Sequence, residues 1–196
     1  GRVLAGSSRI LKELEQLRPD PPLFPRDPAE YARALELERH FDEEVAPALR
    51  RLFWSTYFER PSDCARMATD GFGGPTRILF TALFPVLKVA FRANMGVDST
   101  QVSEARRNLV RYFDRICSEL GPSGYLVGDR FTVADLAVAS VMTAVVRPPQ
   151  FPYPIPEPWP PELLEIREEI DGHPGVAWVL RMYALHRGKS AELVTS

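Results

Sequence analysis

Several residue groups in this 196-residue chain carry side chains that could do chemistry, and the first is the stretch FTVADLAVAS. Thr132 and Asp135 lie three residues apart in it, as a hydroxyl and a carboxylate that could form a catalytic pair or a double helix cap. With Thr132 as the N-cap, each side chain can reach the other's backbone N–H. Because a buried helix end must satisfy its free N–H groups, we interpret the pair as structural capping.

A second candidate lies near the start of the chain, in the stretch GSSRI. Ser7 and Ser8 stand at the beginning of an amphipathic run, where a hydroxyl and free backbone N–H groups together can bind an anion. An ordinary helix cap explains these two residues at least as well when they are considered alone.

A third candidate is the aromatic cluster in RLFWSTYFER, which contains Trp54, Tyr57 and Phe58. These side chains could line a pocket for an apolar ligand, with the tyrosine hydroxyl as a polar handle. Core packing or a dimer contact is the competing interpretation. Four nearby arginines could assist with anionic ligands, although solvated helix faces explain them more simply: Arg50, Arg51, Arg60 and Arg66.

Neither the cysteines nor the histidines have the spacing of a metal site, so no metal is expected. Cys64 and Cys117 lie far apart, which favours a reducing, cytoplasmic setting. Cys64 follows a helix break and could be a reactive thiol, but a structural role is the simpler interpretation. Cys117 lies in an apolar helical stripe and is expected in the core.

Composition describes an ordinary soluble globular protein, with 45% apolar and 26% charged residues. The net charge of −2 and the pI near 6.0 argue against general nucleic-acid binding, which needs a basic surface. The most apolar segment, 78–91, is interrupted by Pro85 and Lys88 and is shorter than the ~20 residues that span a bilayer. We expect a buried core helix there and no membrane association.

Helical periodicity runs through almost the whole chain, and no convincing strand pattern appears, so the predicted fold class is all-α. Asp27, followed by Pro28, is a strong helix start, and Pro47 could bend the helix that follows. Proline-rich stretches at 19–28 and 148–161 should be extended or irregular. The expected helices are 7–17, 28–58, 74–96, 98–121, 132–146, 161–170 and 173–188.

The stretch GYLVGDRFTVADLAVASV strongly resembles the segment that opens a buried helix in the C-terminal domain of cytosolic glutathione transferases. The order of elements agrees, from GSSRI through a proline-rich linker and long helices to the terminal HPGVAWV. The resemblance covers essentially the whole chain. It implies a remnant of a thioredoxin-like domain at 1–18 (its last strand and helix), a linker at 19–27, and a helical glutathione-transferase C-terminal-like bundle at 28–196.

The resemblance also implies glutathione as co-substrate. Ser7 matches the family serine that binds the γ-glutamyl carboxylate, with Ser8 beside it, whereas Gly6 stands where the family usually has Glu or Asp. The helix with the aromatic cluster matches the one that flanks the family's acceptor cleft. The family's activating residue and its cis-proline loop belong to a part of the thioredoxin-like domain that should precede this chain, so no catalytic residue is assigned here.

The resemblance therefore predicts a transferase that conjugates glutathione thiolate to apolar electrophiles in a full-length parent protein. The 196-residue chain alone should be inactive, and the parent should be a cytoplasmic homodimer. Two alternatives remain open: a non-catalytic dimerisation or docking module, and a carrier of apolar ligands.

Overall fold

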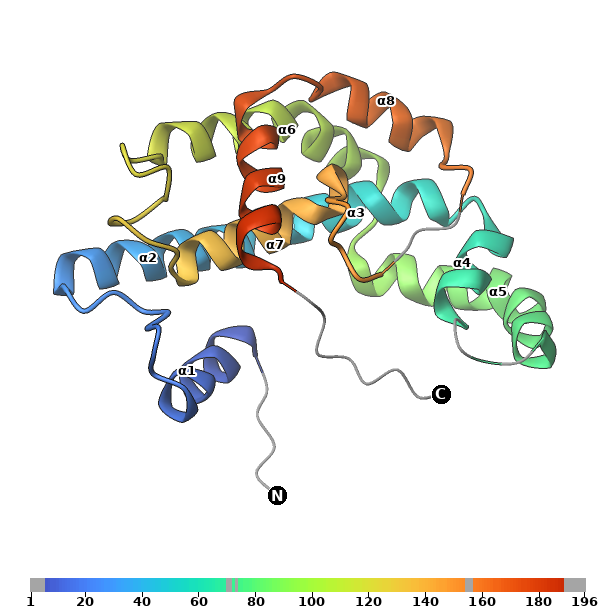
Figure 1. The fold of residues 1–196 in the computed structure, drawn as a ribbon. Helices are drawn as coiled ribbons and strands as arrows, with labels where there is room; N and C mark the ends of the chain where they lie inside the picture. Colours follow the sequence, from blue (N-terminus) through green and yellow to red (C-terminus); the bar gives the residue numbers. More distant parts are fainter. Residues whose placement is uncertain (1–5, 70–71, 73, 154–156, 189–196) are drawn as a thin grey trace.

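The computed structural model describes residues 6–69, 72, 74–153 and 157–188, and these contain helices but no strands. The predicted all-α fold class is confirmed. Figure 1 shows the helices in chain order: α1 (Ser7–Leu17), α2 (Pro28–His40), the π-helix η1 (Phe41–Val45), α3 (Ala46–Tyr57), α4 (Pro61–Ala68), α5 (Gly74–Met95), α6 (Ser99–Glu119), α7 (Val133–Val146), α8 (Pro161–Glu169) and α9 (Pro174–His186).

The elements α2, η1 and α3 form one continuous rod. It starts as predicted, with the Asp27 carboxylate accepting hydrogen bonds from the N–H groups of Ala29 (2.9 Å) and Glu30 (3.0 Å). The π-helical turn η1 ends at Val45, two residues before Pro47. Because proline has no N–H to donate and its ring clashes with the carbonyl four residues earlier, a wider turn relieves the conflict.

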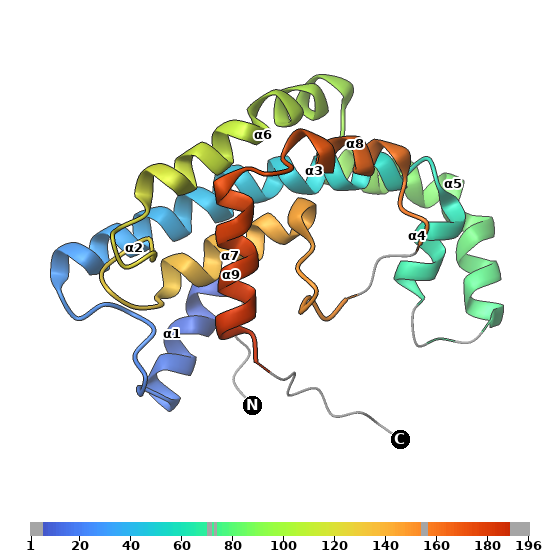
Figure 2. The ribbon, with the colours of Figure 1, turned by 45° about the horizontal axis from the view of Figure 1, so that its top comes forward.

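Helix α7 is the centre of the bundle. It packs against α2, η1 and α3 on one side and against α9 and α8 on the other, as the two views in Figures 1 and 2 indicate. Val138 and Met142 are fully buried in it. Helix α6 packs on α3 and α9 and contributes Leu109 and Phe113 to the same core.

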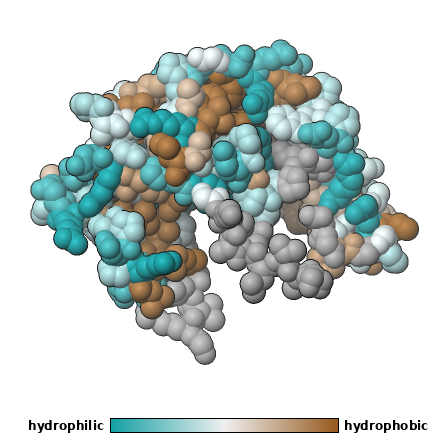
Figure 3. Space-filling model, in the orientation of Figure 1, coloured by the Kyte–Doolittle hydropathy of each residue, from teal (hydrophilic) through white to brown (hydrophobic). Residues whose placement is uncertain are grey.

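The molecule forms an arch, with α1 at one foot and the α4–α5 pair at the other (Figures 1 and 2). In Figure 3 hydrophobic residues gather on the inner side of the foot that contains α1. Helix α1 is attached to α2 by a hydrogen bond from the Ser8 hydroxyl to the Glu38 carboxylate. The strand expected before α1 falls on residues 1–5, outside the described residues, so the thioredoxin-like remnant stays a prediction.

The expectation of a buried core helix at 78–91 is wrong. Helix α5 packs mainly on α4, and Phe84 is its one fully buried side chain among the described residues. Its 22 residues are long and apolar enough to cross a membrane by length and composition, yet only 6% of its most apolar window is buried. Apolar composition predicts that a segment avoids water, but it does not determine which element covers it. The exposed apolar side chains are Ile78, Leu79, Leu83, Val86, Val89 and Phe91.

Candidate ligand-binding site

Two adjoining pockets lie along α7, and Ser140 lines both of them. The first, of about 330 Å³, lies between α7 and the end of α9. The second, of about 310 Å³, lies between α7 and the η1–α3 part of the rod, and Phe151 closes one side. Both have the size and mixed apolar and polar lining of small-molecule sites. We call the two together the α7 groove.

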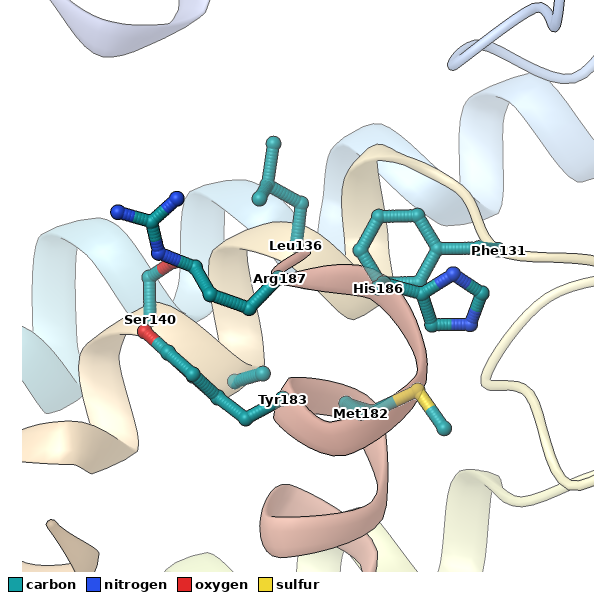
Figure 4. A pocket seen from close by; sticks show the side chains of 8 residues that line it. Phe131, Leu136, Ser140, Met182, Tyr183, His186 and Arg187 are labelled. Carbon is teal, nitrogen blue, oxygen red and sulfur yellow. The ribbon is translucent and has the colours of Figure 1, made fainter. Parts of the chain in front are cut away.

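The first pocket, drawn in Figure 4, contains a tyrosine hydroxyl directed at the groove. Tyr183 on α9 points toward Ser140. Burial raises the pKa of Tyr183 above its ordinary value, and the side chains of Ser140 and Thr143 only partly offset the rise. The hydroxyl therefore stays protonated at neutral pH and can donate a hydrogen bond.

His186 lies at the opposite edge of the first pocket (Figure 4). Its ring stacks on Phe131 at 4.2 Å between centroids, and its Nε2 lies 3.2 Å from the Tyr125 hydroxyl. Burial lowers the pKa of His186, and Arg181 lowers it further while Asp135 opposes the change. The imidazole is therefore mostly neutral at pH 7, and it can exchange a proton with a ligand.

The second pocket contains a partly buried cation. The Arg147 guanidinium carbon lies 4.8 Å from the ring centroid of Phe53 and 5.0 Å from that of Phe151. Burial lowers the pKa of Arg147 to about 10, so the side chain is still charged at neutral pH. Its Nε atom is buried and has no hydrogen-bond partner within the part of the chain that the structure describes.

The serines predicted to bind glutathione lie at the start of α1 and do not line the α7 groove. Ser7 is exposed, whereas the Ser8 hydroxyl is engaged with the Glu38 carboxylate. Gly6 occupies the N-cap with φ 91°, a conformation that favours glycine over the acidic residue usual in the family. Glutathione binding by Ser7 and Ser8 stays a prediction.

The predicted acceptor-pocket residues lie mostly inside the protein. Tyr57 and Phe58 are buried in a cluster with Cys64 and Phe84, and Trp54 packs against this cluster while partly exposed. Burial raises the pKa of Tyr57 to about 12. These three residues do not line the α7 groove, although the neighbouring Phe53 does, so their role with an acceptor stays a prediction.

The Thr132–Asp135 pair forms a capping box at the start of α7. The Asp135 carboxylate accepts hydrogen bonds from the Thr132 N–H (2.9 Å), the Thr132 hydroxyl (3.0 Å) and the Leu126 N–H (2.9 Å). The bond to Leu126 also ties the loop before α7 to the helix. These groups satisfy one another, so they are not available for chemistry.

The two cysteines are poor nucleophiles in this fold. Cys64 is buried and its thiol donates to the Tyr57 carbonyl at 3.0 Å; burial raises its pKa to about 12. Burial raises the pKa of Cys117 as well. Among the described residues, no group of three potential metal ligands occurs.

Sequence reasoning missed the polar residues that the α7 groove brings together. Tyr183 and His186 looked like part of a terminal helix, and Arg147 like the first residue of a proline-rich connection. The one local signal was an arginine, where glycine is usual, at a helix end directly before two prolines. The partners of these residues lie far away in the sequence, so their spacing carries no signal.

Residues 75–160, from α5 through α7 to the start of α8, match the family model of the glutathione S-transferase C-terminal domain. This match agrees with the resemblance of the sequence to the C-terminal domain of glutathione transferases, and the described residues form an all-helical bundle.

No curated protein matches this chain. A solved structure, a glutathione S-transferase from Methylobacterium radiotolerans JCM 2831 in complex with glutathione sulfonate, is 22% identical to it. The alignment covers 98% of this chain and 70% of that chain, with a TM-score of 0.43. A similarity this low does not define how the helices should be arranged.

Proposed function

We propose that the chain is the helical part of a glutathione transferase, in which the α7 groove holds the electrophilic acceptor. The observation that carries the proposal is an apolar groove with convergent polar groups, on the central helix of a glutathione S-transferase C-terminal domain. In the reaction, the glutathione sulfur attacks the acceptor, a carbon–sulfur bond forms, and the leaving group departs with its electron pair.

The division of labour follows from the side chains present. The groove binds and orients the acceptor, and Tyr183 donates a hydrogen bond to it. Thiolate formation requires a group that lowers the thiol pKa. Within the described residues, the pKa values of Cys64 and Cys117 are raised, and so are those of Tyr57 and Tyr183. We therefore propose that an upstream thioredoxin-like segment of a longer parent protein activates glutathione, and that Ser7 and Ser8 contribute to its carboxylate site.

A conjugation assay tests this proposal. The 196-residue chain and a longer parent that includes the upstream segment are each mixed with glutathione and 1-chloro-2,4-dinitrobenzene. We expect conjugation above the spontaneous rate by the parent alone. Conjugation by the 196-residue chain would contradict the assignment of thiol activation to the upstream segment. A parent that neither conjugates nor shows heat of glutathione binding by calorimetry would contradict the transferase proposal itself.

We further propose that the parent works as a homodimer in a reducing compartment, the cytoplasm. Both cysteines are free thiols, which suits such a setting. Sedimentation of the parent at micromolar concentration tests the assembly, and a single species of monomer mass would contradict it.

A further inference from the structure

We propose that the second pocket is an anion-recognition site, in which Arg147 binds the carboxylate or sulfonate of an aromatic ligand. The inference deepens the proposed function, because it names the class of acceptor: an aromatic electrophile that carries a negative charge. Only the role of the ligand as an acceptor rests on the proposed function. Binding of the anion is a property of this chain and can be measured without the reaction.

The first observation is the position of the Arg147 guanidinium close to two aromatic rings. Phe53 comes from α3 and Phe151 from the connection after α7, and both rings line the pocket together with Arg147. Contact with two rings restricts the side chain, which lowers the entropy lost when a ligand binds. A guanidinium held in this way presents its remaining N–H groups as a planar fork, the geometry that matches a carboxylate.

The second observation is that this charge lacks a partner. Among the ion pairs of the described residues, none includes Arg147 or Arg50, the other arginine of the pocket. A partly buried cation is costly unless an anion compensates it, and the unpaired Nε atom adds to that cost. A bound anion would compensate the charge.

One carboxylate, that of Asp42, also lines the pocket. Asp42 precedes Phe53 by eleven residues on the rod, which places the two about 16 Å apart along the helix axis at 1.5 Å per residue. The Arg147 end of the pocket is therefore remote from this negative charge. The groups that face a ligand there, Ser140 and Thr143, carry neutral hydroxyls.

The third observation is the backbone of Arg147. It is the residue after α7 and adopts the left-handed conformation, with φ 52° and ψ 70°, as the single non-glycine case of positive φ among the described residues. Glycine is the usual residue at this kind of helix end, and another residue costs about 1 kcal/mol or more. An arginine at a position that suits glycine indicates a role for its side chain.

Fluorescence titration tests the site with two matched probes. The first is 8-anilinonaphthalene-1-sulfonate, and the second is N-phenyl-1-naphthylamine, which has the same rings without the sulfonate. We expect the wild-type chain to bind the sulfonate roughly 10- to 100-fold more tightly than Arg147→Met does, the range for a charged hydrogen-bonded contact. Binding of the neutral probe should change less than about threefold.

Arg130→Met is the matched control, because Arg130 is exposed in the loop before α7 and lines neither pocket. It should leave sulfonate binding within about threefold of wild type. Arg187 lines the first pocket, and loss of sulfonate binding in Arg187→Met but not in Arg147→Met would overturn the proposal and move the anion to that pocket. Equal losses for both probes in Arg147→Met would also overturn it, since they would show an apolar site without charge recognition.

A folding control keeps the test decisive. Methionine keeps the unbranched stem of the arginine and removes a costly, partly buried charge, so the urea midpoint of Arg147→Met should be no lower than that of wild type. If that variant fails to fold, Arg147→Lys retains the charge and loses the planar fork, and it should still weaken sulfonate binding severalfold. Unchanged binding in a folded Arg147→Lys would count against recognition by the guanidinium.

The titration contains no glutathione, so its failure is distinguishable from failure of the transferase proposal. In the parent protein, the same inference predicts that 4-chloro-3,5-dinitrobenzoate is conjugated with a lower KM than 1-chloro-2,4-dinitrobenzene. Arg147→Met should remove this difference in KM. An enzyme that conjugates both acceptors with equal KM would overturn the anionic acceptor and leave the transferase intact.

Discussion

The Asp135 side chain is a carboxylate whose polar atoms are used within the fold. It accepts hydrogen bonds from the backbone of Thr132 and Leu126 and from the Thr132 hydroxyl, and it is fully buried. Burial raises its pKa, while these hydrogen bonds to the charged form oppose the rise. Its function is to satisfy donors that would otherwise be buried without partners.

Asp135→Ala should therefore lower the free energy of unfolding by about 1–2 kcal/mol or more, the range for a lost helix cap. The N–H groups of Thr132 and Leu126 lose their acceptor in this variant, and buried unpaired donors add to the cost. Urea unfolding monitored by circular dichroism measures the change. Asp129→Ala, in the exposed part of the same loop, is the control and should change little. An unchanged midpoint for Asp135→Ala would refute the capping role.

The buried Cys64 thiol gives a prediction that depends on pH. With a pKa of about 12, only about one Cys64 in ten thousand is a thiolate at pH 8, and the thiolate fraction rises only as pH approaches that pKa. Iodoacetamide at pH 8 should leave Cys64 unmodified in the native chain and modify it in urea, as peptide mass spectrometry can show. Rapid native labelling of Cys64 would contradict its burial and support a reactive thiol.

At the scale of elements, two apolar helices have opposite environments. Helix α7 has 14 residues and is surrounded by the rod, α8 and α9, whereas α5 has 22 residues and packs mainly on α4. Both sequences are dominated by apolar residues, so composition predicts burial equally well for each. The difference arises because α7 has neighbours on several sides, whereas α5 packs mainly on α4 within the described residues.

Substitutions on α5 test this difference directly. Val86 is 73% exposed and Phe84 is 2% exposed, two positions apart on one helix. Val86→Lys should change the free energy of unfolding by less than about 0.5 kcal/mol, as expected of an exposed position. Phe84→Ala should lower it by about 3–5 kcal/mol, because a large buried ring leaves a cavity. Chemical unfolding of both variants measures the contrast, and a large loss in Val86→Lys would show that the apolar face of α5 is covered in solution.

At the scale of the whole molecule, α1 and the proline-rich linker are fastened to the bundle by a few polar contacts. The Glu15 carboxylate accepts hydrogen bonds from the linker N–H groups of Leu23 (2.8 Å) and Phe24 (3.5 Å). The Leu23 carbonyl in turn accepts from the Val133 N–H at the start of α7, at 2.9 Å. The linker is therefore an ordered bridge between α1 and the central helix.

Glu15→Ala should loosen this bridge without unfolding the bundle. Hydrogen exchange at the amides of Leu23 and Phe24 should become faster, because each loses its acceptor, while exchange within α7 stays as slow as in wild type. Exchange measured by mass spectrometry on proteolytic peptides separates the two regions. Lys12→Ala, exposed on the same helix, is the control. Equal acceleration in α7 would show that α1 and the bundle unfold as one unit.

What the sequence determined by itself is local. Asp27 and Thr132 each mark a helix start, because an N-cap and its partners lie within three residues of one another along the chain. The helices of the rod, α6 and α7 follow from apolar spacing, and the capped stretch at the start of α7 carries the family resemblance of the sequence. The bend at Pro47 stays a prediction, and the π-turn directly before it has a local cause too, since a proline conflicts with the turn that precedes it.

Tertiary structure alone decided which groups meet. Arg147 lies close to the rings of Phe53 and Phe151, and Tyr183 reaches Ser140, over separations in the chain that no spacing rule covers. Likewise, whether an apolar helix is buried depends on how many neighbours the packing supplies, which left α7 enclosed and α5 exposed. Capping and periodicity act between neighbours in the chain, whereas a binding groove is made by residues brought together only when the helices pack.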